Sequence, residues 1–314
     1  MFVKLLEFEP IRILIISASP RSDNNCPDEI GKSKRLVDHL LSREIPGVEY
    51  DLLDLAVRGK IVQPCKGCVS TAGPHCHYPC TCYSKGNKNF PDLMHDEDIY
   101  HRLELCHGFL VVTPIHWYSI PTSLKAMFDR LVCINGGNPW PELTGKDKRL
   151  SRRLEILPEV KLITRNHLAG RSAAFYVFGD NGANELGEDD YPWFMRQEDK
   201  DYPPETNKCF VQPESAVMPI AMQCLYSGIH VDKNHIVGEM FGENIPYGLN
   251  NVTFHRQEGI FNQVDELIDS FIKSIRTRLK TIPRMMPYEE KEKDRQTIDF
   301  EALIRKIYET NYPD

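Results

Sequence analysis

The feature that most limits the fold of this chain is Ile11–Ser17, a nearly continuous run of apolar, mostly β-branched residues. A run of this kind is typical of a central strand covered on both faces, as in a parallel sheet. It ends in the polar turn Ser17-Ala-Ser-Pro-Arg21, and residues 32–41 then have the spacing of an amphipathic helix. The opening of the chain therefore predicts a strand, a polar loop and a helix.

This alternation continues along the chain. Further strands are predicted over 48–55, 108–114, 171–178 and 235–241, and further helices over about 96–105, 121–132, 214–226 and 261–280. Polar, glycine and proline residues follow the strands, with a turn expected at Gly179–Gly182. The pattern predicts an α/β fold with a doubly wound, five-stranded parallel sheet.

The remaining segments predict additions to this plan. We expect one domain over residues 1–282 with insertions at about 134–170 and 183–212. The tail 283–314, with its run EEKEKDR and a short helical stretch, is expected to make oligomer contacts.

Charge and hydropathy exclude several classes of protein. Lys and Arg total 38 against 45 Asp and Glu, a net charge of −7, which argues against binding nucleic acid through a basic surface. The apolar runs are far shorter than the roughly 20 residues that span a bilayer. Residues 1–10 lack the pattern of a secretory signal, so we expect a cytoplasmic protein without membrane association.

The turn after the first strand has the chemistry of an anion site. It brings hydroxyls and a guanidinium (Ser17, Ser19, Arg21) toward the start of the next helix at Lys32 and Ser33. Helix N-termini bind anions through free N–H groups and the helix dipole. The turn matches neither G-x-G-x-x-G nor the nucleoside triphosphatase loop, so a terminal phosphate, as in FMN, fits better than a dinucleotide. An ordinary polar loop is the alternative.

A second motif follows the third strand. It reads Thr113-Pro-Ile-His-Trp-Tyr118, and the next helix contains Leu124-Lys-x-x-x-Asp-Arg130. Together with the first turn, these motifs resemble the NAD(P)H-dependent FMN reductase family of flavodoxin-like proteins. The resemblance is close over about 11–135 and loose over 171–275.

The resemblance implies a flavodoxin-like fold and a set of FMN contacts. The phosphate would be bound by Ser17, Ser19, Arg21, Lys32 and Ser33. The isoalloxazine would lie against Thr113, Pro114, Ile115, His116 and Trp117, with Gly179, Asp180 and Asn181 from a third loop. The long stretch 22–30 departs from the common family pattern and separates Arg21 from the helix start.

Five of the ten cysteines fall within 18 residues: Cys65, Cys68, Cys76, Cys80 and Cys82. Their position resembles that of the cysteine motif in the iron–sulfur flavoproteins, although the spacing from Cys68 to Cys76 is longer here. Thiolates at this density can bind a four-iron cluster or, with His75 and His77 nearby, a zinc ion. A metal-free thiol or disulfide loop is the other interpretation.

These features predict an FMN-dependent oxidoreductase. It would take hydride from NADH or NADPH and reduce a quinone, a flavin or another small aromatic acceptor, with His116 or Tyr118 assisting proton transfer. Alternatives are an iron–sulfur flavoprotein that exchanges single electrons with a protein partner, and a flavin-binding redox sensor or electron carrier. The resemblance also implies a homodimer or homotetramer.

Overall fold

The computed structural model describes residues 10–21, 30–57, 60–164, 166–180, 213–241, 249, 252–281 and 298–311. It contains one five-stranded sheet in the order β2-β1-β3-β4-β5, with every neighbouring pair parallel. The strands are β1 (Ile11–Ser17), β2 (Val48–Asp54), β3 (Gly108–Pro114), β4 (Ser172–Asp180) and β5 (His230–Phe241). This strand order is that of the flavodoxin-like doubly wound fold, so the predicted fold class is confirmed.

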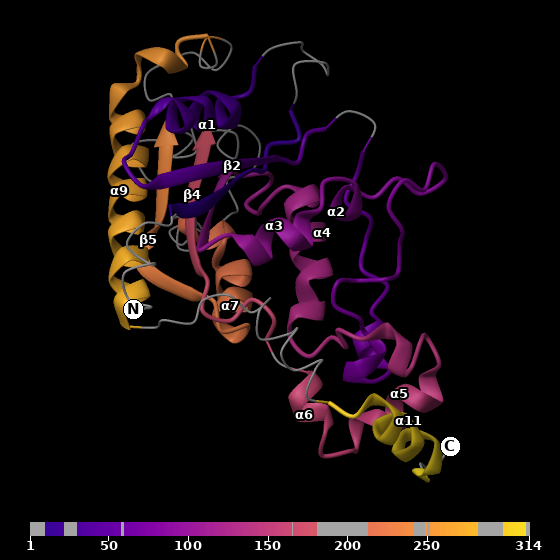
Figure 1. Ribbon diagram of the computed structural model, residues 1–314. Coiled ribbons are helices and arrows are strands. Elements are labelled where there is room, and N and C mark those ends of the chain that lie inside the picture. The colour runs from indigo at the N-terminus through magenta and orange to yellow at the C-terminus, as the bar shows by residue number, and fades with distance from the viewer. Residues whose placement is uncertain are drawn as a thin grey trace, which may run out of the picture.

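Helices cover both faces of the sheet (Figure 1). The α-helices are α1 (Lys32–Ser42), α2 (Leu93–Asp96), α3 (Ile99–Leu105), α4 (Thr122–Arg130), α5 (Lys148–Glu155), α6 (Val160–Ile163), α7 (Met218–Tyr226), α9 (Glu258–Thr281) and α11 (Phe300–Glu309). Short 3-10 helices are η2 (Cys68–Ser70), η3 (Gly73–His75), η4 (Leu131–Ile134), η5 (Pro141–Leu143), η8 (Pro213–Ala216) and η9 (Phe254–Arg256).

Two apolar cores lie on the two faces of the sheet. On one face, α1 and α9 pack on the sheet through residues such as Leu36, Val264 and Phe271. On the other, α3, α4 and α7 pack on side chains such as Val111 and Phe175. Each central strand therefore buries both of its faces, which explains why its sequence is apolar almost throughout.

A third, smaller cluster joins the insertion to the tail. Trp140, Leu143, Leu154 and Ile163 pack with Leu303 and Ile307 of α11. Figure 1 shows α5, α6 and α11 together in one lobe beside the sheet. The Lys306 ammonium pairs with the Glu159 carboxylate, so the tail helix is fixed to the insertion of its own chain. Contacts of the tail in an oligomer stay a prediction.

The element boundaries differ most from the predicted ones in four places. The helix predicted over 96–105 is divided into α2 and α3, because Asp98 has a left-handed backbone (φ 50°). The helix predicted over 214–226 is a 3-10 turn followed by α7. Strand β5 begins at His230 rather than 235, and β4 runs through Asp180, so the turn predicted at 179 is wrong. The second insertion, 183–212, lies outside the described residues.

Within the described residues, none of the helices combines the length and apolar character that crossing a bilayer requires.

Candidate functional site

The predicted site residues gather where the winding of the sheet reverses. Strands β1 and β3 are neighbours in the sheet, and the chain continues from them in opposite directions along it. In open α/β sheets, ligands bind in the crevice outside the carboxyl ends of two such strands. Here those ends are Ser17 and Pro114. The two loops that the sequence singled out therefore leave the sheet side by side.

The loop after β1 folds back against the start of α1. Ser17 and Ser19 are buried, and the backbone N–H of Arg21 donates to Ser19 Oγ over 3.2 Å. A Cβ placed on Gly31 would lie 3.5 Å from Arg21 Cβ and 3.6 Å from Ser19 Oγ. The predicted residues on both sides of the 22–29 segment, which lies outside the described residues, are thus close together in space.

The first turn of α1 offers polar groups to an anion. Gly31 at the N-cap position has no side chain to accept the helix N–H groups, and the helix starts with Lys32-Ser33-Lys34. Ser33 Oγ is buried, and no hydrogen bond to it is found within the described ranges. A buried hydroxyl is normally paired, so an unpaired one beside a helix N-terminus indicates a missing polar ligand. These residues fit the phosphate of FMN.

The loop after β3 forms the second wall. Thr113 is fully buried and donates from Oγ1 to the Pro114 carbonyl over 3.1 Å. The backbone N–H of Ile115 donates to the carbonyl of Phe178 over 2.8 Å, which ties this loop to the end of β4. Gly179 is buried there and lies in β4 with Asp180, while Asn181 lies outside the described residues. The carboxyl ends of β1, β3 and β4 thus share one edge.

A tight two-residue turn closes the second loop. His116 and Ser119 exchange two backbone hydrogen bonds of 2.7 and 3.0 Å, with Trp117 and Tyr118 between them. Both central residues have positive φ, 48° and 62°. This is the requirement of a type I′ turn, which normally holds Asn-Gly. Bulky aromatic residues in this conformation are strained, and such strain is concentrated at ligand sites.

The turn directs both aromatic side chains outward. Trp117 is 94% exposed and Tyr118 is 62% exposed. The sequence predicted that Trp117 lies outside the core, and its exposure agrees with this. Its large apolar surface is available to a planar ligand. Its role as a flavin contact stays a prediction.

His116 is the titratable group of this loop. Partial burial of its imidazole lowers the pKa of His116 below the ordinary value of about 6.5. The ring is therefore neutral at neutral pH, so it can accept a proton but does not act as an imidazolium acid.

The cysteine loop lies between β2 and α2 and is fixed to the insertion. The carbonyl of Cys76 accepts from the N–H of Asn138 over 2.7 Å, and Tyr78 donates back to Asn138 over 3.0 Å. His75 Nδ1 lies 3.0 Å from Ser151 Oγ of α5. The N–H of Gly73 donates to the Glu155 carboxylate.

The five thiols of this loop do not form one coordination shell. Cys68 Sγ and Cys82 Sγ are 3.1 Å apart, whereas the N–H of Gly67 donates to Cys65 Sγ. Cys76 and Cys80 are buried. In the part of the chain that the structure describes, no three His, Cys, Asp or Glu side chains are arranged to bind a metal ion. The metal prediction therefore gains no support from the described residues.

Burial controls the protonation of two thiols of this loop, those of Cys76 and Cys82. It raises the pKa of Cys76 to about 12 and that of Cys82 to about 12, the latter with help from the hydrogen bond to Cys68. Burial also lowers the pKa of His77 to about 4.

Sequence reasoning missed a buried ion pair beside the cysteine loop. Arg130 of α4 donates from both terminal nitrogens to the two oxygens of Asp92, each over 3.1 Å, and both side chains are fully buried. Its guanidinium also lies 4.7 Å from the centre of the Tyr83 ring. Arg130 belongs to the Leu-Lys-x-x-x-Asp-Arg motif, so a signal existed, but nothing local identified Asp92 as its partner.

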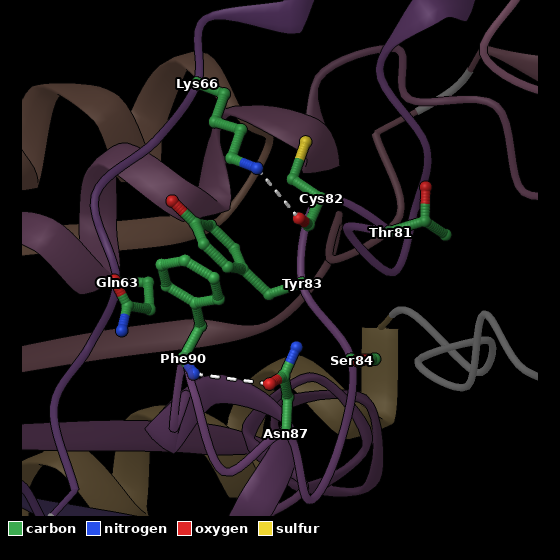
Figure 2. A pocket seen from close by; sticks show the side chains of 8 residues that line it. All are labelled: Gln63, Lys66, Thr81, Cys82, Tyr83, Ser84, Asn87 and Phe90. Carbon is green, nitrogen blue, oxygen red and sulfur yellow. Dashed lines mark hydrogen bonds between the residues drawn. The ribbon is translucent and has the colours of Figure 1, made fainter.

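A cavity that Tyr83 helps to line was not predicted either. Its volume is about 410 Å³. Figure 2 shows its lining, which consists of Gln63, Lys66, Thr81, Cys82, Tyr83, Ser84, Asn87 and Phe90.

Comparison with known proteins supports the assignment of the first half of the chain. Residues 11–146 match the family described as NADPH-dependent FMN reductase. This stretch, which is less than half of the chain, is similar to that family. The predicted resemblance is thereby confirmed, and both loops that flank the switch point lie within the matched residues 11–146.

One curated relative matches over part of its length. It is an iron-sulfur flavoprotein of Methanosarcina thermophila, 27% identical over 128 residues, which are 41% of this chain and 56% of the relative. The match thus spans little more than half of that protein. An iron–sulfur flavoprotein resemblance was predicted from the cysteine loop.

Two solved structures show low similarity to this chain. RosB with a bound 8-demethyl-8-formylriboflavin-5'-phosphate is 11% identical, with a TM-score of 0.44 over 92% of this chain and 88% of that chain. An azoreductase from Bacillus anthracis is 14% identical, with a TM-score of 0.39 over 83% and 98%. The fold assignment itself rests on the strand order of this chain.

Proposed function

We propose that the chain is an FMN-dependent oxidoreductase that takes hydride from NADH or NADPH and reduces a small aromatic acceptor, such as a quinone or a flavin. The observation that carries this proposal is the buried, unpaired Ser33 Oγ at the start of α1, beside the loop after β1. A phosphate at that point completes the hydrogen bonding of the hydroxyl. The match of residues 11–146 to the FMN reductase family supports the same ligand.

When bound, FMN supplies the redox chemistry, and the protein supplies position and electrostatics. Arg21 and Lys32 neutralise the phosphate charge together with the dipole of α1. Ser19 and Ser33 provide hydroxyls that orient it. The strained turn presents Trp117 as a flat apolar surface that shields the ring from water. Reduction of the acceptor consumes protons, and the His116 ring is neutral at neutral pH. His116 therefore assists by relaying to the acceptor a proton that it takes up from water.

A reduction assay tests the proposal. Protein reconstituted with FMN is mixed anaerobically with NADH or NADPH, and the visible flavin absorbance is followed. We expect the absorbance to bleach with at least one of the two nucleotides and to return when a benzoquinone or free FMN is added. An FMN-loaded protein that neither nucleotide reduces would refute the proposal, and reduction without reoxidation by any aromatic acceptor would favour an electron carrier.

We further propose that two or more copies of this chain associate through α7. This helix has no charged residue, and its residues Met218, Met222, Leu225 and Tyr226 are exposed along one side. Across a two-fold axis this apolar stripe would meet the same stripe of a second copy. Because the stripe has no charge, the two surfaces would not repel each other, and both would bury apolar area. Light scattering should give a dimer or tetramer that Met222→Glu dissociates. The control Ile61→Glu, also at an exposed apolar residue, should not change the mass.

A further inference from the structure

The cysteine loop brings two thiols into direct contact. Cys68 Sγ and Cys82 Sγ lie 3.1 Å apart, although 14 positions separate them in the chain. A disulfide bond has a length of about 2.05 Å, so the two sulfurs need to approach by only about 1 Å. Both residues are half-buried. The loop is fixed by its hydrogen bonds to Asn138 and to α5, which hold the two thiols near each other.

A cation faces the pair from the insertion. Lys146 Nζ lies 3.8 Å from each of the two sulfurs and donates to the carbonyl of His75 over 3.2 Å. A neighbouring ammonium stabilises negative charge on a sulfur during exchange. Burial outweighs this cation at Cys82, whose thiol stays protonated at neutral pH.

Cys82 also forms part of the wall of the cavity in Figure 2. Lys66 reaches over this wall, where its ammonium donates to the Cys82 carbonyl over 3.2 Å and lies 4.5 Å from the centre of the Tyr83 ring. The eight lining residues include this one cation and no carboxylate. A small molecule that carries carboxylates is therefore favoured beside Cys82.

We propose that Cys68 and Cys82 form a reversible dithiol–disulfide pair, which exchanges with a small, carboxylate-bearing disulfide that enters this cavity. In the first step the Cys82 thiol loses its proton as its sulfur attacks one sulfur of the disulfide. That S–S bond breaks, and the leaving sulfur takes up the proton and departs as a thiol. In the second step Cys68 attacks the Cys82 sulfur of the mixed disulfide and releases the second thiol. The dithiol is oxidised, and the external disulfide is reduced to two thiols.

Oxidation of the pair acts on the cavity itself. The new bond closes residues 68–82 into a loop. Cys82 precedes Tyr83, whose ring centre lies 4.5 Å from Lys66 Nζ and 4.7 Å from the Arg130 guanidinium. A disulfide at Cys82 therefore restricts the movement of this wall. The inference does not depend on FMN, because none of these residues belongs to the flavin site.

The test uses the full chain, reduced and then freed of reductant, with oxidised glutathione as the probe. After incubation to completion, peptide mapping should show one intramolecular disulfide that joins Cys68 to Cys82, and two thiols per chain should be lost. Two molecules of reduced glutathione should be released per chain. The variant Cys68→Ser should stop at a glutathione adduct on Cys82, and Cys82→Ser should form neither product.

Cys65→Ser is the matched control, because Cys65 lies in the same loop outside the pair. It should form the Cys68–Cys82 disulfide as the unmodified chain does. Stoichiometric zinc or iron in the purified protein, lost in Cys65→Ser, would overturn the proposal in favour of a metal site. A different pairing, or no loss of thiols in the unmodified chain, would also overturn it. Peptide mapping of the unmodified chain gives the answer even if a variant does not fold.

Discussion

The turn at Trp117 and Tyr118 predicts that replacing Tyr118 with glycine does not destabilise the protein. Tyr118 has φ 62° and is 62% exposed, so its side chain adds little packing while its backbone is strained. A left-handed L-residue costs about 1–2 kcal/mol, and a new glycine costs about 0.4–1 kcal/mol through the entropy of the unfolded chain. We therefore expect Tyr118→Gly to leave the free energy of unfolding unchanged or to raise it by up to about 1.5 kcal/mol.

Tyr308 provides a matched control. It is also 62% exposed but lies in the helix α11, where φ is negative and glycine is unfavourable. Tyr308→Gly should therefore cost about 1 kcal/mol. Chemical denaturation of both variants, followed by circular dichroism, measures the difference. Equal destabilisation of the two variants would refute the strain argument.

The same substitution should impair the flavin site, because strain that is retained without a packing benefit points to function. We expect Tyr118→Gly and Trp117→Ala to slow the reoxidation of bound flavin and to alter its visible spectrum. Since Trp117 is 94% exposed, its truncation should leave the melting temperature nearly unchanged, whereas a core Trp costs about 3–5 kcal/mol. A spectrum and turnover identical to those of the unmodified chain would remove this turn from the site.

Three other predictions follow from buried or charged groups. Arg21→Ala should weaken FMN binding by about 1.5–3 kcal/mol, the value of a charge-assisted hydrogen bond, without loss of fold, and unchanged affinity in a titration would exclude Arg21 from the phosphate site. Arg130→Ala should lower the free energy of unfolding by about 3–5 kcal/mol, because it leaves the Asp92 carboxylate charged and buried without a partner. A loss of less than about 0.5 kcal/mol, the usual range for a surface substitution, would contradict this prediction. Burial lowers the pKa of His235, so below about pH 6.5 the unfolded chain binds more protons than the folded chain. The contribution of neutral His235 to the free energy of unfolding should therefore be fully present above about pH 6.5 and should be lost as the pH falls below it. In His235→Gln the free energy of unfolding should fall less steeply with decreasing pH.

The central strands could be predicted from the sequence almost to the residue. Ile11–Ser17 and Gly108–Pro114 are buried on both faces, so their apolar runs mark their full length. Strand β5 was predicted too short, because it is at the edge of the sheet, where the polar stretch Asp232–Asn234 is tolerated. The end of β4 was missed for a related reason: Gly179 and Asp180 pair with the end of β5, which no local pattern reports.

Much of the candidate site could be predicted as well, because parallel strands bring their carboxyl ends to one edge. The loop after β1 was therefore identified by residue type and position, and the loop after β3 by its motif together with the family resemblance. The left-handed turn at Trp117 was not predictable, since its residues are ones that such turns avoid. The pairing of Cys68 with Cys82, and of Arg130 with Asp92, depends on tertiary contacts between distant segments.

Binding of FMN and riboflavin to the flavin-free protein tests the central claim most directly. The two ligands share the same ring and differ in the phosphate, which we place against Arg21, Ser33 and the start of α1. In a fluorescence titration we expect FMN to bind at least about tenfold more tightly than riboflavin, since even one charge-assisted hydrogen bond contributes about 1.5–3 kcal/mol. Equal affinity for the two ligands, or no binding of either, would contradict the assignment of this site.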